Sequence, residues 1–177
     1  LLATGSEDTD ERQTIKLWDS ASGRLARGWF GGRGTVSALA FAPDGRTLAS
    51  AHLDAKGGVR LWDVATGQLL AELPGRAGKA RCVAFHPSGR WLAAGWADGT
   101  AAIWDVAERR RVHDLDGHVG SVQELAFSPT SELLATASSD GTIRLWDAAS
   151  GRLRKILEGG KFLSVAFSPD GATLAAA

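Results

Sequence analysis

Four side chains in the second half of the chain carry groups that could take part in catalysis: His118, Thr136, Asp140 and Trp146. A histidine, a carboxylate and a hydroxyl form the triad with which many hydrolases activate a nucleophile. Such a nucleophile needs an exposed turn, whereas Thr136 (or Ser138, on the same strand face) lies in the middle of a predicted strand. An indole N–H that needs a buried acceptor explains the same set without a reaction. We therefore predict a structural hydrogen-bond network and no catalytic residue.

Two further features could bind a metal or react. The acidic segment 7–12 places Asp8, Asp10 and Glu11 at near-alternate positions, as a calcium loop would. It lacks the glycine and the terminal acid of an EF-hand, so we predict a solvated turn and no metal site. The single cysteine, Cys82, lies in an apolar run; we predict a buried small side chain, and one cysteine excludes an internal disulfide. No cofactor is expected.

The elements that must position these side chains repeat along the chain. A Trp-Asp pair recurs at intervals of 44, 42 and 42 residues, starting at Trp18, Trp62, Trp104 and Trp146. Self-similarity at this period is typical of an array of four-stranded units, the blades of a β-propeller.

A second signature, an apolar run that ends in Phe-x-Pro, precedes the last three of these tryptophans and recurs after the fourth. Its phenylalanines are Phe41, Phe85, Phe127 and Phe167. Proline cannot donate to a strand ladder, and the Asp-Gly that follows it in two copies tolerates a tight turn. We therefore predict that inner strands end at these phenylalanines, which should be buried.

The unit around Trp146 shows the expected strands most clearly. A short apolar strand at 122–127 suits the inner position, and 133–138 pairs back with it. The run 142–146 alternates with a period of two, as a strand with one buried face does. A more polar strand at 152–157 belongs on the solvated outer edge, as do its equivalents at 68–73 and 110–115.

Together these features resemble the WD-repeat family over essentially the whole chain. The resemblance implies an all-β propeller in which a histidine after a glycine, a strand hydroxyl, a turn aspartate and the tryptophan form a buried network. Only the repeat with His118, Thr136, Asp140 and Trp146 matches every position. Elsewhere His118 is matched by Arg76 and Gly32, and Thr136 is matched by Ser50, Thr4 and Ala94.

The expected blade units are 1–30 (incomplete), 31–73, 74–115, 116–157 and 158–177 (incomplete), within a single partial propeller. The first and last segments, 1–6 and 173–177, align with the same second strand of a blade. The template predicts three strands, three complete four-stranded antiparallel blades and two more strands. Because such blades suit rings of about seven, about four of them should form an open arc. We expect the sequence to be a fragment of a longer array.

Composition limits the partners. Twenty basic and 20 acidic residues cancel, so no general attraction to nucleic acid or membrane is expected. No apolar run is long enough to span a membrane. Arginine outnumbers lysine fifteen to five, and Asn, Tyr and Met are absent, which favours a bacterial source. We expect a cytoplasmic protein, although an upstream signal peptide stays open.

The predicted partner-binding rim is the edge of the disc formed by the loops before the inner strands and the turns after the second strands. Its candidate residues are Arg33, Arg76, Trp96, His52, Asp10 and Lys56. Arginine and tryptophan are enriched at binding hot spots. For Trp96, which replaces Ser138 of the best repeat, a bulky local core is an equal alternative.

We therefore predict a non-catalytic scaffold that binds a protein or peptide partner. By resemblance, the partner docks on the rim near the central channel. Further blades of a parent chain, or self-association through open end blades, would cover the ends of the arc. The alternatives are a propeller enzyme with a site at the channel mouth and a purely structural spacer between other domains.

Overall fold

The structure is a computed structural model that describes residues 1–6, 14–32, 34–54, 58–75 and 78–177. These residues form seventeen β-strands and no helix. The strands make five separate antiparallel sheets with three, four, four, four and two strands along the chain. This is the series that the repeat predicted. None of the described residues belongs to a helix that could cross a membrane.

Each sheet consists of strands that are consecutive in the sequence. The first contains β1 (Leu2–Gly5), β2 (Ile15–Trp18) and β3 (Leu25–Trp29). The second contains β4 (Val36–Phe41), β5 (Thr47–His52), β6 (Val59–Asp63) and β7 (Leu69–Leu73). The third contains β8 (Ala80–Phe85), β9 (Trp91–Trp96), β10 (Ala101–Asp105) and β11 (Arg110–Leu115). The fourth contains β12 (Val122–Phe127), β13 (Leu133–Ser138), β14 (Thr142–Asp147) and β15 (Leu153–Glu158), and the last contains β16 (Val165–Phe167) and β17 (Leu174–Ala176).

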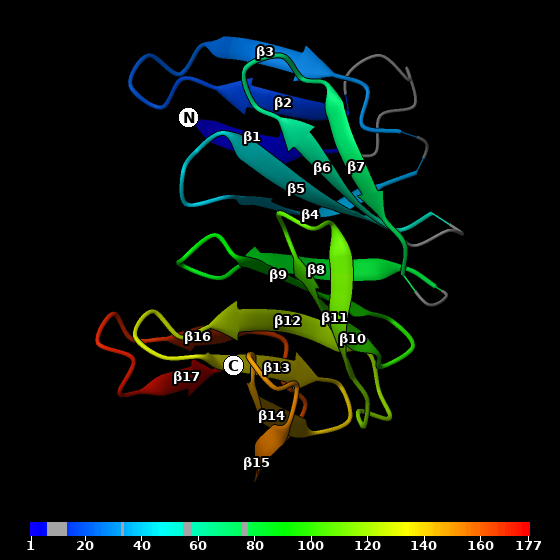
Figure 1. Ribbon diagram of the computed structural model, residues 1–177, viewed down its shortest axis with the longest axis vertical. Coiled ribbons are helices and arrows are strands. Elements are labelled where there is room, and N and C mark those ends of the chain that lie inside the picture. Colours follow the sequence, from blue (N-terminus) through cyan, green and yellow to red (C-terminus); the bar gives the residue numbers. More distant parts are fainter. Residues whose placement is uncertain (7–13, 33, 55–57, 76–77) are drawn as a thin grey trace.

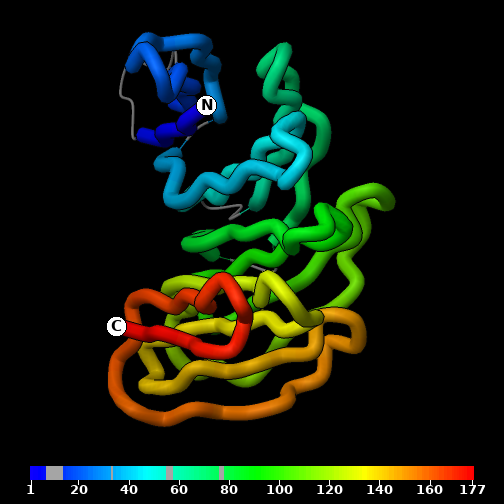
Figure 2. Tube along the Cα trace, turned by 90° about the vertical axis from the view of Figure 1, so that its left-hand side faces the viewer, coloured from blue at the N-terminus to red at the C-terminus, as the bar shows by residue number. Residues whose placement is uncertain are grey.

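The sheets stack side by side along the long axis of the molecule (Figure 1). The first strands of successive sheets, β4, β8, β12 and β16, contact one another across the sheet boundaries. The fourth strands lie at the opposite edge of each sheet. In the perpendicular view the N-terminal and C-terminal sheets lie far apart (Figure 2). The chain is therefore an open arc of propeller blades, with the first strand of each complete blade on its inner side.

The core lies between successive sheets rather than inside any one of them. Because side chains alternate along a strand, β5 faces two neighbours. Leu48 packs with Ile15 and Leu17 of the first sheet. Ala49 and Ala51, on the other face, pack in the cluster that contains Trp96 and Trp104 of the third sheet. Small residues on one face thus make room for indoles from the next blade.

The turns after the inner strands follow the predicted Pro-Asp-Gly chemistry. The N–H of Gly45 donates to the carbonyl of Ala42 at 2.9 Å, and Gly45 has a φ of 68°. Glycine adopts this left-handed backbone without steric cost, so the turn reverses the chain within a few residues.

The phenylalanines that end the inner strands are less buried than expected. Phe127 is buried, whereas Phe41, Phe85 and Phe167 are half-buried. The inner strand is the free edge of its sheet. Phe127 differs from the other three in its edge-on contact with His86, whose ring centroid lies 5.2 Å away. The outer strand β15 also starts one residue later than predicted, because the Arg152 carbonyl accepts from the Asp147 N–H within the preceding turn.

Candidate partner-binding rim and buried polar network

The fourth sheet brings together the four side chains singled out in the sequence. His118 Nδ1 lies 2.8 Å from Asp140 Oδ2, and His118 Nε2 lies 2.8 Å from Thr136 Oγ1. The indole Nε1 of Trp146 donates to the same Thr136 hydroxyl at 2.9 Å. The hydroxyl of Ser138 donates instead to the Gly120 carbonyl at 3.0 Å. The loop before β12, strand β13, its turn and strand β14 are thereby tied together.

Burial and hydrogen bonding fix the charges in this network. Burial lowers the pKa of His118, although its hydrogen bond to Asp140 acts to raise it. Burial acts to raise the pKa of Asp140, but hydrogen bonds from Thr142, His118 and the Val119 N–H lower it to about 2. A neutral imidazole can then donate from Nδ1 to the carboxylate and accept the Thr136 O–H at Nε2.

The geometry of this network suits cohesion rather than attack on a substrate. The side chains of His118 and Asp140 are 0% and 3% exposed, and Thr136 is fully buried. A nucleophile must reach a substrate atom, which a buried mid-strand hydroxyl cannot do. The network gives the Trp146 N–H an acceptor and joins four segments of one blade by hydrogen bonds.

The second sheet builds an equivalent network from a different residue, His52. Trp62 Nε1 donates to Ser50 Oγ at 2.7 Å, and Ser50 Oγ lies 2.7 Å from His52 Nε2. His52 is fully buried, so its predicted place on the rim is wrong. Residues 50 and 52 share one face of β5, and this strand alternation was the sequence signal that could have placed the imidazole inside. Its turn partner Asp54 pairs instead with Arg60 at 3.1 Å.

The tryptophans of the other two Trp-Asp pairs, Trp18 and Trp104, have different surroundings. Trp18 Nε1 donates to Thr4 Oγ1 at 2.9 Å. The third sheet has Ala94 at the hydroxyl position, and there Trp104 packs against Trp96 with ring centroids 5.6 Å apart. Trp96 is only 1% exposed. The prediction that Trp96 forms a bulky local core is confirmed, and the prediction that it contacts a partner is wrong. Its indole points from β9 into the core between the second and third sheets.

The remaining rim candidates, Arg33, Arg76, Asp10 and Lys56, lie outside the described residues, as does the acidic segment with Asp8 and Glu11. Among the residues that are described, no cluster of three or more His, Cys, Asp or Glu side chains could hold a metal ion. Cys82 is buried in the inner strand β8, and burial raises the pKa of its thiol to about 12.

The inner strands carry a feature that the sequence analysis missed. Strands β4, β8 and β12 each contain a bulge, so that one residue is left out of the pairing with the second strand; the bulged residues are Ser37, Arg81 and Gln123. Ser37 and Arg81 are exposed and Gln123 is half-buried. A bulge re-aims the side chain of the extra residue. The sequence signal was a polar residue that interrupts each apolar run at the same position.

We call Ser37, Arg81 and Gln123 the channel-side row, because each is the second residue of a strand that lines the inner side of the arc. Ser37 Oγ donates to the Ala80 carbonyl of the next blade at 2.7 Å. Arg81 Nη1 donates to Gln123 Oε1 at 3.3 Å. These bonds link three blades side by side at the channel mouth. Val119, in the rim loop before β12, is 91% exposed.

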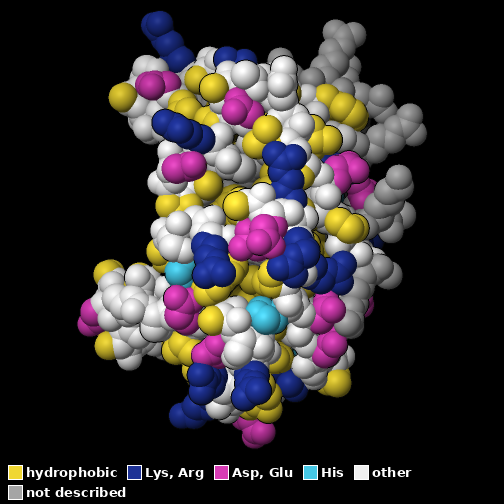
Figure 3. All heavy atoms as spheres, in the orientation of Figure 1, with side chains coloured by type: hydrophobic (Ala, Val, Ile, Leu, Met, Phe, Trp, Pro, Cys, Tyr) yellow, Lys and Arg dark blue, Asp and Glu magenta, His cyan; other side chains and the backbone are white. Residues whose placement is uncertain are grey.

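The outer edge of the arc presents a different surface. There basic and acidic side chains are interleaved (Figure 3). Arg110 pairs with Glu108 at 2.8 Å, and Arg111 pairs with Asp114 at 3.0 Å. Exposed pairs of this kind contribute little to stability, but they neutralise one another.

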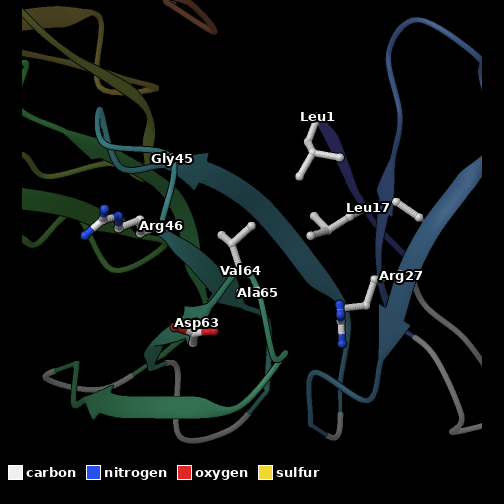
Figure 4. Close-up of a pocket in the computed structure, with 9 residues that line it drawn as sticks. Leu1, Leu17, Arg27, Gly45, Arg46, Asp63, Val64 and Ala65 are labelled. Atoms are coloured by element: carbon white, nitrogen blue, oxygen red, sulfur yellow. The ribbon is translucent and has the colours of Figure 1, made fainter.

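A cleft of about 520 Å³ lies between the first and second sheets. Leu1 and Leu17 face Val64 across it (Figure 4). A Cβ placed on Gly45 would meet no described atom within 4 Å, whereas one on the equivalent Gly89 would lie 3.7 Å from Pro43 Cδ of the preceding turn. At the equivalent place between the second and third sheets, the turn of the preceding blade occupies this space. The packing of blades therefore accounts for the cleft without a ligand.

Comparison with known families agrees with this geometry. The pattern of the family described as WD domain, G-beta repeat matches residues 25–63, 67–105 and 109–147. Each match starts at an outer strand or one to two residues before it and ends at a Trp-Asp pair, so one sequence repeat spans two neighbouring sheets. A search of curated proteins found no match. With most of its length in three matched repeats and its strands in propeller blades, the chain belongs to the WD40 repeat family.

Proposed function

We propose that this chain is a non-catalytic scaffold that holds a peptide segment of a protein partner on its rim, beside the channel-side row. WD40 repeats are in general protein-interaction modules. One observation about this chain carries the proposal. The polar groups that could perform chemistry are buried and hydrogen-bonded to one another. In contrast, Ser37 and Arg81 near the starts of β4 and β8, and Val119 in the loop before β12, are exposed.

The rim offers both an apolar and a polar contact. Val119 is the most exposed large apolar side chain among the described residues. Its loop packs against the neighbouring turn, since a Cβ on Gly99 would lie 2.6 Å from the His118 carbonyl. A hydrogen bond also fixes the loop to the turn after β13, because the Val119 N–H donates to Asp140 Oδ2 at 3.1 Å. An exposed apolar side chain on a fixed loop is suited to anchoring a partner.

Panning a random-peptide phage library against the 177-residue chain tests this proposal. Peptides selected in this way should bind the wild type and should lose about tenfold or more in affinity with Val119→Asp. The matched control is Leu153→Asp, which adds the same charge to an exposed leucine of outer strand β15 and should leave binding unchanged. Failure to select any peptide, or sensitivity to Leu153→Asp alone, would contradict the proposal.

A further inference from the structure

We infer that the partner segment is acidic and that Arg81 binds one of its carboxylates at the channel mouth, with Lys79 beside it. The inference deepens the proposed function and rests on it, because it names the chemistry of the peptide that the rim would hold.

Two exposed basic side chains lie at the start of β8: Lys79 directly before the strand and Arg81 as its second residue. Ala80, between them, is fully buried, whereas Lys79 and Arg81 are exposed. The bulge falls at Arg81, since Ala80 pairs with Trp96 and Cys82 pairs with Gly95. Trp96, which is buried in β9, therefore pairs with the residue next to Arg81 and has no contact with the proposed peptide.

The guanidinium of Arg81 has unused donors. It carries five N–H groups, and within the described ranges its hydrogen bond is that from Nη1 to Gln123 Oε1. Neither Arg81 nor Lys79 forms an ion pair with any residue in the described ranges. The bond to Gln123 fixes one side of the planar fork and leaves other N–H groups for a carboxylate, which arginine can bind through two parallel bonds.

The neighbouring blades show that this positive charge is specific to the third sheet. The two positions held by Lys79 and Arg81 are Thr35 and Ser37 in the second sheet, and Ser121 and Gln123 in the fourth. Hydroxyl and amide groups thus flank the cations. Ser121 Oγ is buried, whereas exposed Ser37 and half-buried Gln123 carry groups that can bond to a peptide backbone. The nearby carboxylate of Glu124 is engaged elsewhere, because its Oε2 accepts from the Val165 N–H at 3.0 Å.

The arginines at the outer edge of the arc differ from Arg81 in their ion pairing. Three arginines of its outer strands have acidic partners: Arg110 with Glu108, Arg111 with Asp114 and Arg154 with Asp147. An unpaired cation on a surface attracts an anionic partner and sets the register of docking. A peptide fits better than a nucleic acid, because phosphate tracking uses several cations along a groove and this site has two in a chain of zero net charge.

The test measures fluorescence anisotropy with the complete 177-residue chain and two labelled hexapeptides, one of alternating glutamate and glycine and one with glutamine in place of glutamate. The acidic peptide should bind more tightly. Arg81→Gln should weaken its binding about tenfold, and Arg81→Lys, which keeps the charge but loses the fork, should weaken it less. The matched control is Arg110→Gln, which removes the same charge at the outer edge and should change affinity less than about twofold. Equal melting temperatures would establish that the variants are folded.

Three outcomes would overturn the inference. The first is no preference for the acidic peptide, and the second is an equal effect of Arg81→Gln and Arg110→Gln. The third is tighter, Arg81-dependent binding of a labelled oligothymidylate, which would identify a nucleic-acid site. If peptides selected by panning still bind in a Val119-dependent way, only this inference fails. If no peptide of any kind binds, the proposed function fails as well.

Discussion

His118 and His52 satisfy an indole N–H from two different places in the repeat. His118 reaches Thr136 from the loop before an inner strand, whereas His52 reaches Ser50 from two residues along the same strand. Both imidazoles are buried. At the residue scale, the function of each histidine is therefore to complete a hydrogen-bonded chain to a tryptophan between blades.

Replacing Asp140 by alanine should lower the free energy of unfolding by about 1 to 3 kcal/mol, the cost of leaving buried partners unsatisfied. His118 would lose its acceptor, and Thr142 and the Val119 N–H would lose theirs. Asp98→Ala is the matched control, because this turn aspartate is exposed and bonds to Thr100; its effect should be smaller. Urea unfolding measures both. A hydrolytic activity lost in Asp140→Ala at unchanged stability would instead support the enzyme alternative.

His52 should make stability fall between pH 6.5 and pH 4. Burial, followed by the charge of Arg60, lowers its pKa from 6.5 to about 4, against the opposing charges of Asp54 and Glu72. Because the unfolded chain takes up the proton first, the stabilisation is complete above pH 6.5 and disappears as pH falls toward 4. The difference amounts to about 3 kcal/mol.

Denaturant unfolding at several pH values tests this dependence. His52→Ser installs the residue found at the equivalent position of the fourth sheet, and its stability should vary less over this range than that of the wild type. Burial also lowers the pKa of His86 and of His118, so the quantity to compare is the difference in pH dependence between the two proteins. Parallel curves for wild type and His52→Ser would show that His52 does not carry the effect.

At the scale of elements, the spacing of Trp-Asp and Phe-x-Pro predicted most strands within a residue or two, including β4, β12 and β13. The network around His118 was also predictable, because each residue type matches one position of the repeat. The burial of His52 was not predicted, and that of Trp96 was only one of two alternatives, because comparison between repeats treats each departure as surface variation. Strand alternation places both side chains between blades. The bulges in β4, β8 and β12 were not predicted, because one extra residue leaves the hydrophobic pattern of the strand almost intact.

Strand β9 should depend on Trp96 for its packing between blades. Trp96→Ala should destabilise the chain by about 3 to 5 kcal/mol, since it removes a buried indole and leaves a cavity beside Trp104. Trp96→Phe keeps an aromatic ring and should cost less. Thermal unfolding measures both variants. If Trp96→Ala left the melting temperature unchanged, the indole would be free to contact a partner, as the alternative interpretation supposed.

At the scale of the whole molecule, the arc leaves apolar side chains exposed near both ends. Leu2 is 58% exposed on the first sheet and Leu163 is 68% exposed beside the last. Exposed apolar area favours association. We predict that the 177-residue segment self-associates in light scattering, and that Leu2→Lys with Leu163→Lys reduces its mass toward a monomer. The control Leu69→Lys, on an outer strand, should not. A monomeric wild type with protected amides in β1 and β17 would contradict this prediction.

The claim that the rim beside the channel holds the partner is tested most directly by hydrogen–deuterium exchange, with and without a peptide selected by panning. We predict slower exchange in the peptide complex at residues 78–81 and 118–123, which include Arg81, Val119 and Gln123. Exchange in the outer strands β7, β11 and β15 should not change. Protection confined to those outer strands, with none at the two rim segments, would contradict the account.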